Sequence, residues 1–177
     1  MEELLYSALD LAAIISSMEL GCKAQSAFLD QVWENEKPFL WSGYRNNRRQ
    51  MLLDVSYWLS YLSDKATIDA EFPVILRDIR TTGGDLVKEN YVSDYADLDL
   101  FFKSIRLRIL YGGGKDYVRI KRRTLMKRYG YKRLSPALTE HFNRFIYFYH
   151  LQPFVRDLVE CQIDKVDIDD MIVFRVI

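Results

Sequence analysis

Apolar side chains recur at helical spacing through the first third of the chain. A period near 3.6 predicts a helix over residues 2–18, ended near Gly21, and a second helix over residues 23–34. A third helix, capped by Asn46 or Asn47, is predicted to run to about Asp64. The predicted inward positions are Leu4, Leu5, Ala8, Leu11, Ala12, Ile15 and Met18, then Ala27, Phe28, Val32 and Trp33, then Met51, Val55, Trp58 and Leu62. Three such stripes predict a helical bundle.

Residues 69–92 fit two structures. Pro73 can open a short helix that runs to Arg80 and stops at Gly83 and Gly84. Alternatively, residues 74–79 and 86–92 pair as a hairpin. The helix is favoured, but the pattern leaves both open.

From Asp94 the helical pattern is regular. Asp94 and Asp97 resemble a capping box, and the apolar positions that follow predict a helix to about residue 110. Those positions are Tyr95, Leu98, Phe101, Phe102, Ile105 and Ile109. Three glycines, residues 112–114, end this helix, and residues 117–120 alternate as a short strand does.

A pair of helices is predicted next. The first covers residues 122–129, with Leu125 and Met126 inward, and Gly130 allows a positive φ in the turn. Ser135 followed by Pro136 is a preferred start for the second helix. Leu138, Phe142, Phe145 and Tyr149, widened by Ile146, predict its core face. Thr139, Glu140, Asn143, Arg144 and Tyr147 are left on the outer side.

Two strands are predicted after Pro153, over residues 158–163 and 171–176, joined by the acidic segment 164–170. The fold class is therefore mainly α within an α+β arrangement: an N-terminal helical bundle followed by helices with a short β-hairpin. We expect two domains, residues 1–92 and residues 93–177.

Charged residues are unevenly distributed along the chain. Residues 103–134 contain twelve Lys and Arg and one Asp, a net charge of +11, so the rest of this neutral chain carries −11. Such asymmetry predicts an acidic partner, either phosphate or protein, although it could also be neutralised within the chain or across a homodimer.

The element order from residue 94 to the C-terminus is helix, strand, helix, helix, strand, strand. In this order and in its turn chemistry, the segment resembles the winged helix-turn-helix superfamily. The resemblance implies that residues 136–149 form the helix that enters the major groove of DNA. Its implied base-reading residues are Thr139, Glu140, Asn143 and Arg144. The implied phosphate-binding residues are Arg119, Lys121, Arg122, Arg123, Lys127, Arg128, Lys132 and Arg133.

Two features depart from an ordinary winged helix. The reading helix has few basic residues, and the wing carries Asp164, Asp167, Asp169 and Asp170, which disfavour contact with phosphate. The first hypothesis is a non-enzymatic nucleic-acid-binding protein, a regulator or recognition subunit, with DNA favoured over RNA and with the N-terminal helices available for a protein partner or a homodimer. The alternative is an adaptor whose basic face docks an acidic protein.

The residue types needed for catalysis do not cluster. The two histidines, His141 and His150, are interpreted as packing or surface residues, and no zinc-ligand spacing occurs. A small nuclease-like enzyme, built on Asp78, Asp85, Lys88 and Glu89, is the weakest hypothesis. We expect no enzyme activity, no cofactor and no metal.

Cysteine use and hydropathy indicate the compartment. Cys22 and Cys161 are interpreted as reduced and buried, which is typical of a cytoplasmic protein. The apolar run near the start is interrupted by Asp10 and Glu19 and is neither a signal peptide nor a membrane span.

Overall fold

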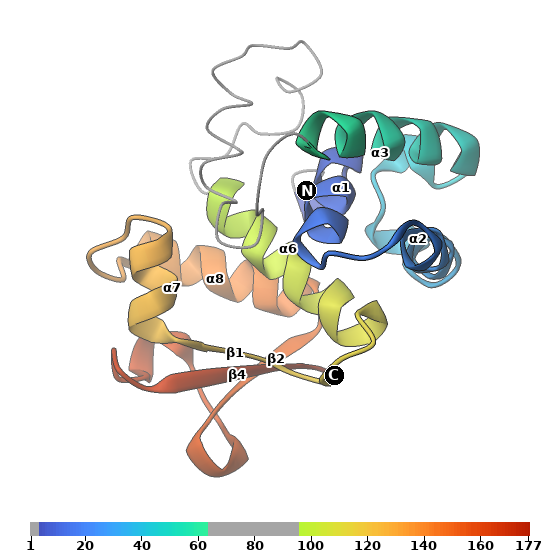
Figure 1. Ribbon diagram of the computed structural model, residues 1–177. Helices are drawn as coiled ribbons and strands as arrows, with labels where there is room; N and C mark the ends of the chain where they lie inside the picture. Colours follow the sequence, from blue (N-terminus) through green and yellow to red (C-terminus); the bar gives the residue numbers. More distant parts are fainter. Residues whose placement is uncertain (1–3, 64–95) are drawn as a thin grey trace. The chain divides into compact units, whose positions relative to one another are not determined.

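The computed structural model describes residues 4–63 and 96–177 (Figure 1). The chain divides into two compact units, Met1–Leu100 and Phe101–Ile177. The expected domain boundary at residues 92 and 93, both alternatives for residues 69–92, the cap at Asp94 and the nuclease-like cluster all lie outside the described residues. The described part is mixed helix and strand, as the α+β prediction requires.

In the first unit, helix α1 (Ala8–Ser17) begins later than the sequence predicts. The Ser7 hydroxyl accepts a hydrogen bond from the backbone N–H of Asp10 at 3.1 Å, and the Asp10 carboxylate accepts one from the Ser7 N–H at 2.9 Å. This reciprocal cap fixes the start of the helix. Upstream, Tyr6 pairs with Leu40 in a parallel bridge, so the predicted helix over residues 2–18 was too long.

Helix α2 spans Cys22–Asn35. Gly21 is the N-cap of this helix, whereas the sequence predicted that it ends the previous one. Its buried face is formed by Phe28, Leu29 and Val32. The predicted inward positions Phe28 and Val32 are confirmed, Trp33 is half-buried, and Ala27 is exposed, so its inward placement was wrong. Two short 3₁₀ turns, Lys37–Phe39 and Ser42–Tyr44, follow.

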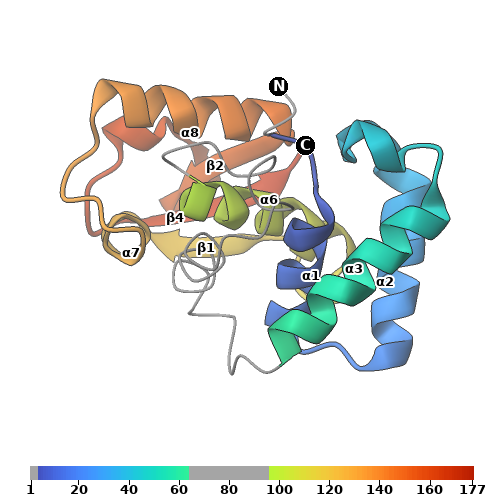
Figure 2. The same ribbon diagram turned by 90° about the horizontal axis from the view of Figure 1, so that it is seen from above.

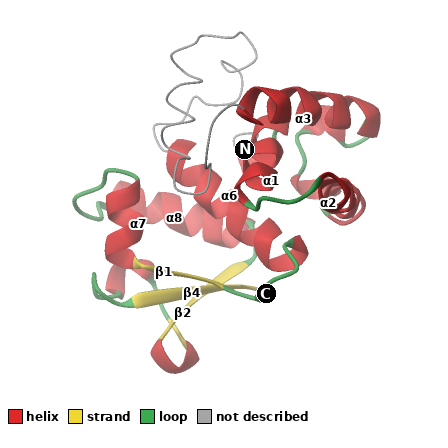
Figure 3. Ribbon diagram, in the orientation of Figure 1, coloured by secondary structure: helices red, strands yellow, loops and turns green. Residues whose placement is uncertain are grey.

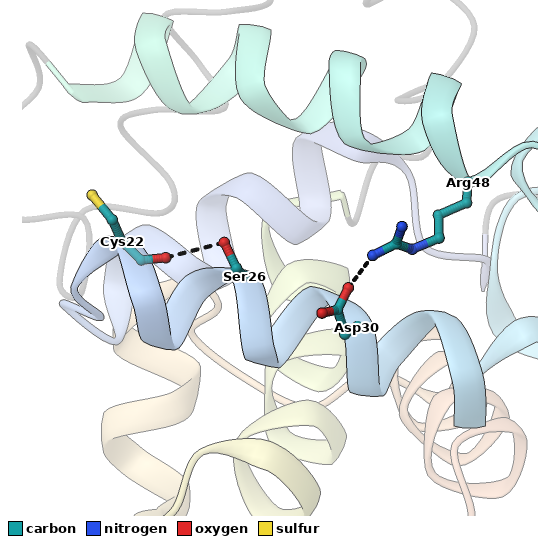
Figure 4. Close-up of polar contacts among 4 residues, drawn as sticks. All are labelled: Cys22, Ser26, Asp30 and Arg48. Atoms are coloured by element: carbon teal, nitrogen blue, oxygen red, sulfur yellow. Dashed lines mark hydrogen bonds and ion pairs between the residues drawn. The ribbon is translucent and has the colours of Figure 1, made fainter.

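Helix α3 (Arg48–Ser63) packs against α1 and carries the predicted stripe. The Asn47 side chain accepts a hydrogen bond from the Gln50 N–H at 3.1 Å, which confirms the predicted cap. Met51, Val55, Trp58 and Leu62 are all buried. Figure 4 shows Arg48, the first residue of α3, paired with Asp30 of α2.

The second unit contains helix α6 (Ala96–Tyr111, whose first turn is assigned to the first unit), α7 (Arg122–Arg128) and α8 (Pro136–Phe148). Both predicted helices of the pair are confirmed. Gly130 has a φ of 80°, as the turn between them was expected to require. The Ser135 hydroxyl accepts the N–H of Leu138 at 3.2 Å, which confirms the cap.

A four-stranded antiparallel sheet completes the second unit within the described residues. Its order is β1-β4-β2-β3, with β1 Val118–Lys121, β2 Leu151–Val155, β3 Val159–Glu160 and β4 Met171–Val176. Ile120 of β1 faces Ile172 of β4, and Pro153 of β2 faces Phe174 of β4. Figure 2 shows α8 running alongside β2, and in Figure 1 the helices α6, α7 and α8 of the second unit lie on one side of the sheet.

The last predicted strand, 171–176, is confirmed, whereas the strand predicted over residues 158–163 is confirmed only at Val159–Glu160 (β3), which pairs with β2. The partner of β4 is β2, which contains Pro153. The Pro153 carbonyl accepts the Cys161 N–H at 3.1 Å, so its backbone polar groups point away from β4. The missing proline N–H therefore costs no bond to β4, and the strand tolerates Pro153. No strand was predicted over Leu151–Val155.

Aromatic rings join α6, α8 and β4 into one core. The Phe102 ring lies 5.3 Å from that of Phe142, 5.8 Å from Phe145 and 6.0 Å from Phe174 between centroids. The predicted core face of α8 is confirmed, since Leu138, Phe142, Phe145 and Tyr149 are buried. His141 is also buried and packs on Phe145, in keeping with its interpretation as a packing residue.

Candidate nucleic-acid interface

Helix α7 separates its apolar and basic residues by face. Leu125 and Met126 are buried, whereas Arg123, Lys127 and Arg128 are exposed. The turn that follows is held by a hydrogen bond from the Tyr131 N–H to the Met126 carbonyl, at 2.9 Å. This turn leaves Lys132 and Arg133 exposed.

Four predicted phosphate-binding residues are therefore exposed on one continuous stretch of the helix pair. We call Lys127, Arg128, Lys132 and Arg133 the cationic rim. Within residues 4–63 and 96–177, none of the four has a carboxylate partner. The rim is therefore available to an outside anion.

Arg122 and Arg123 are placed differently, because the acidic segment 164–170 binds them. The Arg123 guanidinium donates two hydrogen bonds to the Asp169 carboxylate, at 2.6 and 2.7 Å. Arg122 donates from its side chain to the Val166 carbonyl, and its N–H donates to the Asp170 carbonyl at 3.1 Å. The acidic segment thus caps the start of α7. It also occupies the side chains of Arg122 and Arg123, two of the predicted phosphate-binding residues.

This pairing shifts the pKa of both side chains, Arg123 and Asp169. The hydrogen bonds from Arg123 are the main reason that the pKa of Asp169 lies below its usual value, with smaller help from the charges of Arg123 and Lys121. The same contact raises the pKa of Arg123. Both side chains face solvent, so the pair orients the segment without sealing it from water.

Arg119 and Lys121 lie apart from the rim. Both are exposed residues of β1, and Ile120 between them is buried, so they point to the sheet face opposite the core. Other cations of the basic region are used internally, since Arg106 donates to the Tyr149 carbonyl at 2.8 Å. Asp116, the one acid of that region, pairs at 2.7 Å with Arg175, which lies outside it. Lys103 is only 3% exposed. Much of the +11 charge is therefore structural.

The four predicted base-reading residues come together in one shallow groove of about 700 Å³ along α8. Thr139 is the least available of the four, since its hydroxyl donates to the Ser135 carbonyl at 3.1 Å. The lining residues are Leu134, Pro136, Thr139, Glu140, Asn143, Arg144, Tyr147 and Asp164. We call this the α8 groove. The groove begins at Leu134, directly after Lys132 and Arg133 of the rim.

Besides Leu134 and Pro136, the groove contains two residues that were absent from the predicted reading set, Tyr147 and Asp164. Tyr147 was predicted on the outer side of the helix, and its spacing of four residues from Asn143 was the available signal. Asp164 comes from the 3₁₀ turn Ile163–Lys165 in the acidic segment, and only the tertiary fold brings it to α8.

The β2–β3 hairpin forms a second exposed feature, on the opposite side of the sheet from the helices (Figure 3). Its tip passes through the 3₁₀ turn Arg156–Leu158, where Asp157 and Leu158 have positive φ values of 62° and 58°. Leu158 is 58% exposed and Val159 is 59% exposed. The tip therefore exposes two apolar side chains, Leu158 and Val159, next to the charged residues Arg156 and Asp157.

A search of protein-family models, of curated proteins and of solved structures finds nothing that matches this chain. In the described part of the chain, no helix is both long and apolar enough to span a membrane. Nor do the described residues include a group of three or more His, Cys, Asp and Glu side chains that could hold a metal ion.

Proposed function

We propose that this protein is a non-enzymatic nucleic-acid-binding protein with a winged-helix second unit. One observation carries the proposal: the candidate base-reading residues line a single groove, and the exposed cationic rim adjoins it. Cations at the rim supply affinity through phosphate, while polar groups in the groove supply contacts to bases. Within the described residues, no cation of the rim is paired with a carboxylate.

The sheet supports the winged-helix part of the proposal. Strand β1 lies between α6 and α7 in sequence, yet it pairs with β4, the last strand of the chain. β4 in turn pairs with β2, which follows α8 directly. Three helices covering a small antiparallel sheet with this order are the arrangement expected of the winged helix-turn-helix superfamily. The segment between β2 and β4 then corresponds to the wing.

The acidic residues of the proposed wing limit where the protein can contact phosphate. They meet α7 at Asp169 and the α8 groove at Asp164. Carboxylates at these points disfavour phosphate there, so phosphate contacts fall to the cationic rim. The proposed mode is a grip through four cations with few base contacts, which favours loosely specific or partner-assisted binding.

Titration of labelled duplex DNA, single-stranded DNA and RNA at several salt concentrations tests the proposal. If four rim cations neutralise phosphates, log K should fall with log salt at a slope of about −3.6. The double variant Lys127→Ala with Arg128→Ala should weaken binding to every sequence and flatten the slope by about half. Absence of binding at low salt would overturn the proposal.

A matched control removes the same charge from the first unit. Lys23 and Arg49 are both exposed, at the start of α2 and α3 respectively. Lys23→Ala with Arg49→Ala should leave binding unchanged. Equal losses in the two double variants would mean that total charge, and not the rim, governs binding.

Docking of an acidic protein on the same rim is a second candidate function. The observation that favours it is the pair of carboxylates, Glu140 and Asp164, that line the α8 groove beside the rim. These carboxylates oppose a phosphate backbone that runs along the groove, and they equally repel an acidic protein there, so the acidic helix or loop of this candidate would contact the rim alone. Binding of an acidic peptide at the rim, together with no binding of any nucleic acid at low salt, would select this function.

A further inference from the structure

The ring of Tyr147 stands almost entirely in solvent. It is 87% exposed, more than any other large apolar side chain among the described residues. In the same part of the chain, no aromatic ring packs on it and its hydroxyl has no hydrogen-bond partner. The neighbouring Phe148, in contrast, packs its ring 5.1 Å from that of Tyr149. Tyr147 therefore contributes little to the core.

Helical spacing sets this ring beside polar groups. Tyr147 follows Asn143 by four residues and Arg144 by three, so all three share one helix face. All three line the α8 groove. An aromatic face next to an amide and a guanidinium is the combination that stacks an unpaired base and hydrogen-bonds its edge.

The charges of the groove favour a base over a phosphate. Glu140 and Asp164 contribute two carboxylates, and Arg144 contributes one guanidinium. A phosphate inside the groove would meet the two carboxylates, whereas a neutral base would not. Carboxylates can instead accept hydrogen bonds from exocyclic amino groups, as Glu does from cytosine. The phosphates of the same strand would lie outside, along the cationic rim.

We infer that the α8 groove binds one unpaired, amino-bearing nucleobase, stacked on Tyr147, with Asn143 and a groove carboxylate reading its edge. The inference rests on the proposed function and names the form of nucleic acid recognised. A base inside a duplex is stacked on both faces and offers no surface to Tyr147, so the groove selects single strands, loops or ends. The volume of about 700 Å³ suits a small aromatic ligand.

Fluorescence anisotropy with labelled oligo-dC, oligo-dA, oligo-dT and a duplex of equal length tests this inference. Tyr147→Ala should weaken oligo-dC and oligo-dA binding by about 5- to 150-fold, the range expected for loss of one stacked base. Its salt slope should equal that of the unaltered protein, since no phosphate contact is lost. Tyr147→Phe should keep most of the affinity because it keeps the ring.

The matched control is Tyr57→Ala, which removes a 55% exposed tyrosine from α3 in the first unit. It should leave binding of every oligonucleotide unchanged. Thermal melting of both variants checks that the fold is intact, and little change is expected because both rings face solvent. RNA oligonucleotides in parallel show whether a 2′-hydroxyl adds affinity.

The possible outcomes separate the inference from the function on which it rests. If duplex and single strands bind, but Tyr147→Ala weakens neither, the stacking site is wrong and the proposed function stands. If the unaltered protein binds neither form at low salt, the proposed function itself fails. Oligo-dT binding as tightly as oligo-dC would overturn the preference for an amino-bearing base.

Discussion

The carboxylate of Asp169 accepts two hydrogen bonds from the guanidinium of Arg123, at 2.6 and 2.7 Å, although the residues lie 46 positions apart. The contact fastens the acidic segment 164–170 to α7, the first helix of the basic pair. It also removes one cation from the surface that would meet phosphate. The charge pattern of the sequence therefore overstates how many cations are free.

Asp169→Asn should strengthen nucleic-acid binding. The change removes one negative charge and releases Arg123 to contact phosphate, so the salt slope should steepen by about 0.9. Anisotropy titrations at several salt concentrations measure both effects. Asp167→Asn is the matched control, because Asp167 is exposed in the same segment and does not pair with Arg123. An equal gain from the control would show that overall charge is responsible.

Arg123→Ala should return the pKa of Asp169 toward its usual value. In the folded protein this pKa is lowered, mainly by the hydrogen bonds from Arg123. Any stability from the pair is therefore present above the ordinary carboxyl pKa and is lost as pH falls through the lowered value. Carbon-detected NMR titration of the Asp169 carboxyl measures the shift. An unchanged midpoint in the variant would contradict the contact.

Phe102→Ala should destabilise the second unit severely. The ring is fully buried and lies within 6.0 Å of Phe142, Phe145 and Phe174 between centroids. Loss of such a side chain costs about 3–5 kcal/mol, from lost burial and from the cavity left behind. Urea unfolding followed by circular dichroism measures the free energy of unfolding. Phe102→Leu should cost clearly less, and equal losses would contradict a packing role.

Sequence was sufficient where local spacing determines structure. The stripe from Leu138 to Tyr149 repeats every three or four residues, so the buried face of α8 followed from helical geometry alone. The cap at Ser135 is also local, because its hydroxyl reaches an N–H only three residues away. Helix bounds in the second unit were therefore predicted closely, and the candidate reading residues were correctly assigned to the outer face.

Sequence was insufficient where contacts join distant segments. Strand β2 is specified by its pairing with β4, and the local sequence pattern predicted no strand over Leu151–Val155. The Arg123–Asp169 contact depends on how the acidic segment 164–170 folds back on α7, which no local pattern encodes. The same holds for Asp164, which reaches the α8 groove only through tertiary structure.

The two cysteines should differ in reactivity, contrary to the expectation that both are buried. Cys22 is free and exposed at the first residue of α2, whereas Cys161 is free and half-buried behind β2 (Figure 4 shows Cys22). Burial raises the pKa of Cys161, so less of it is thiolate near neutral pH. N-ethylmaleimide at pH 7.5 should therefore modify Cys22 first, as measured by mass spectrometry over time.

Single cysteine variants show which thiol gives the fast modification and which gives the slow one. Cys161→Ser should leave only the fast modification, and Cys22→Ser should leave only the slow one. The slow rate should rise on going from pH 7.5 to pH 9, because more of the Cys161 thiol then ionises, and it should rise further in urea as burial is lost. Two equal rates at pH 7.5 in the native protein would contradict the placement of Cys161, since a half-buried thiol with a raised pKa cannot match an exposed one.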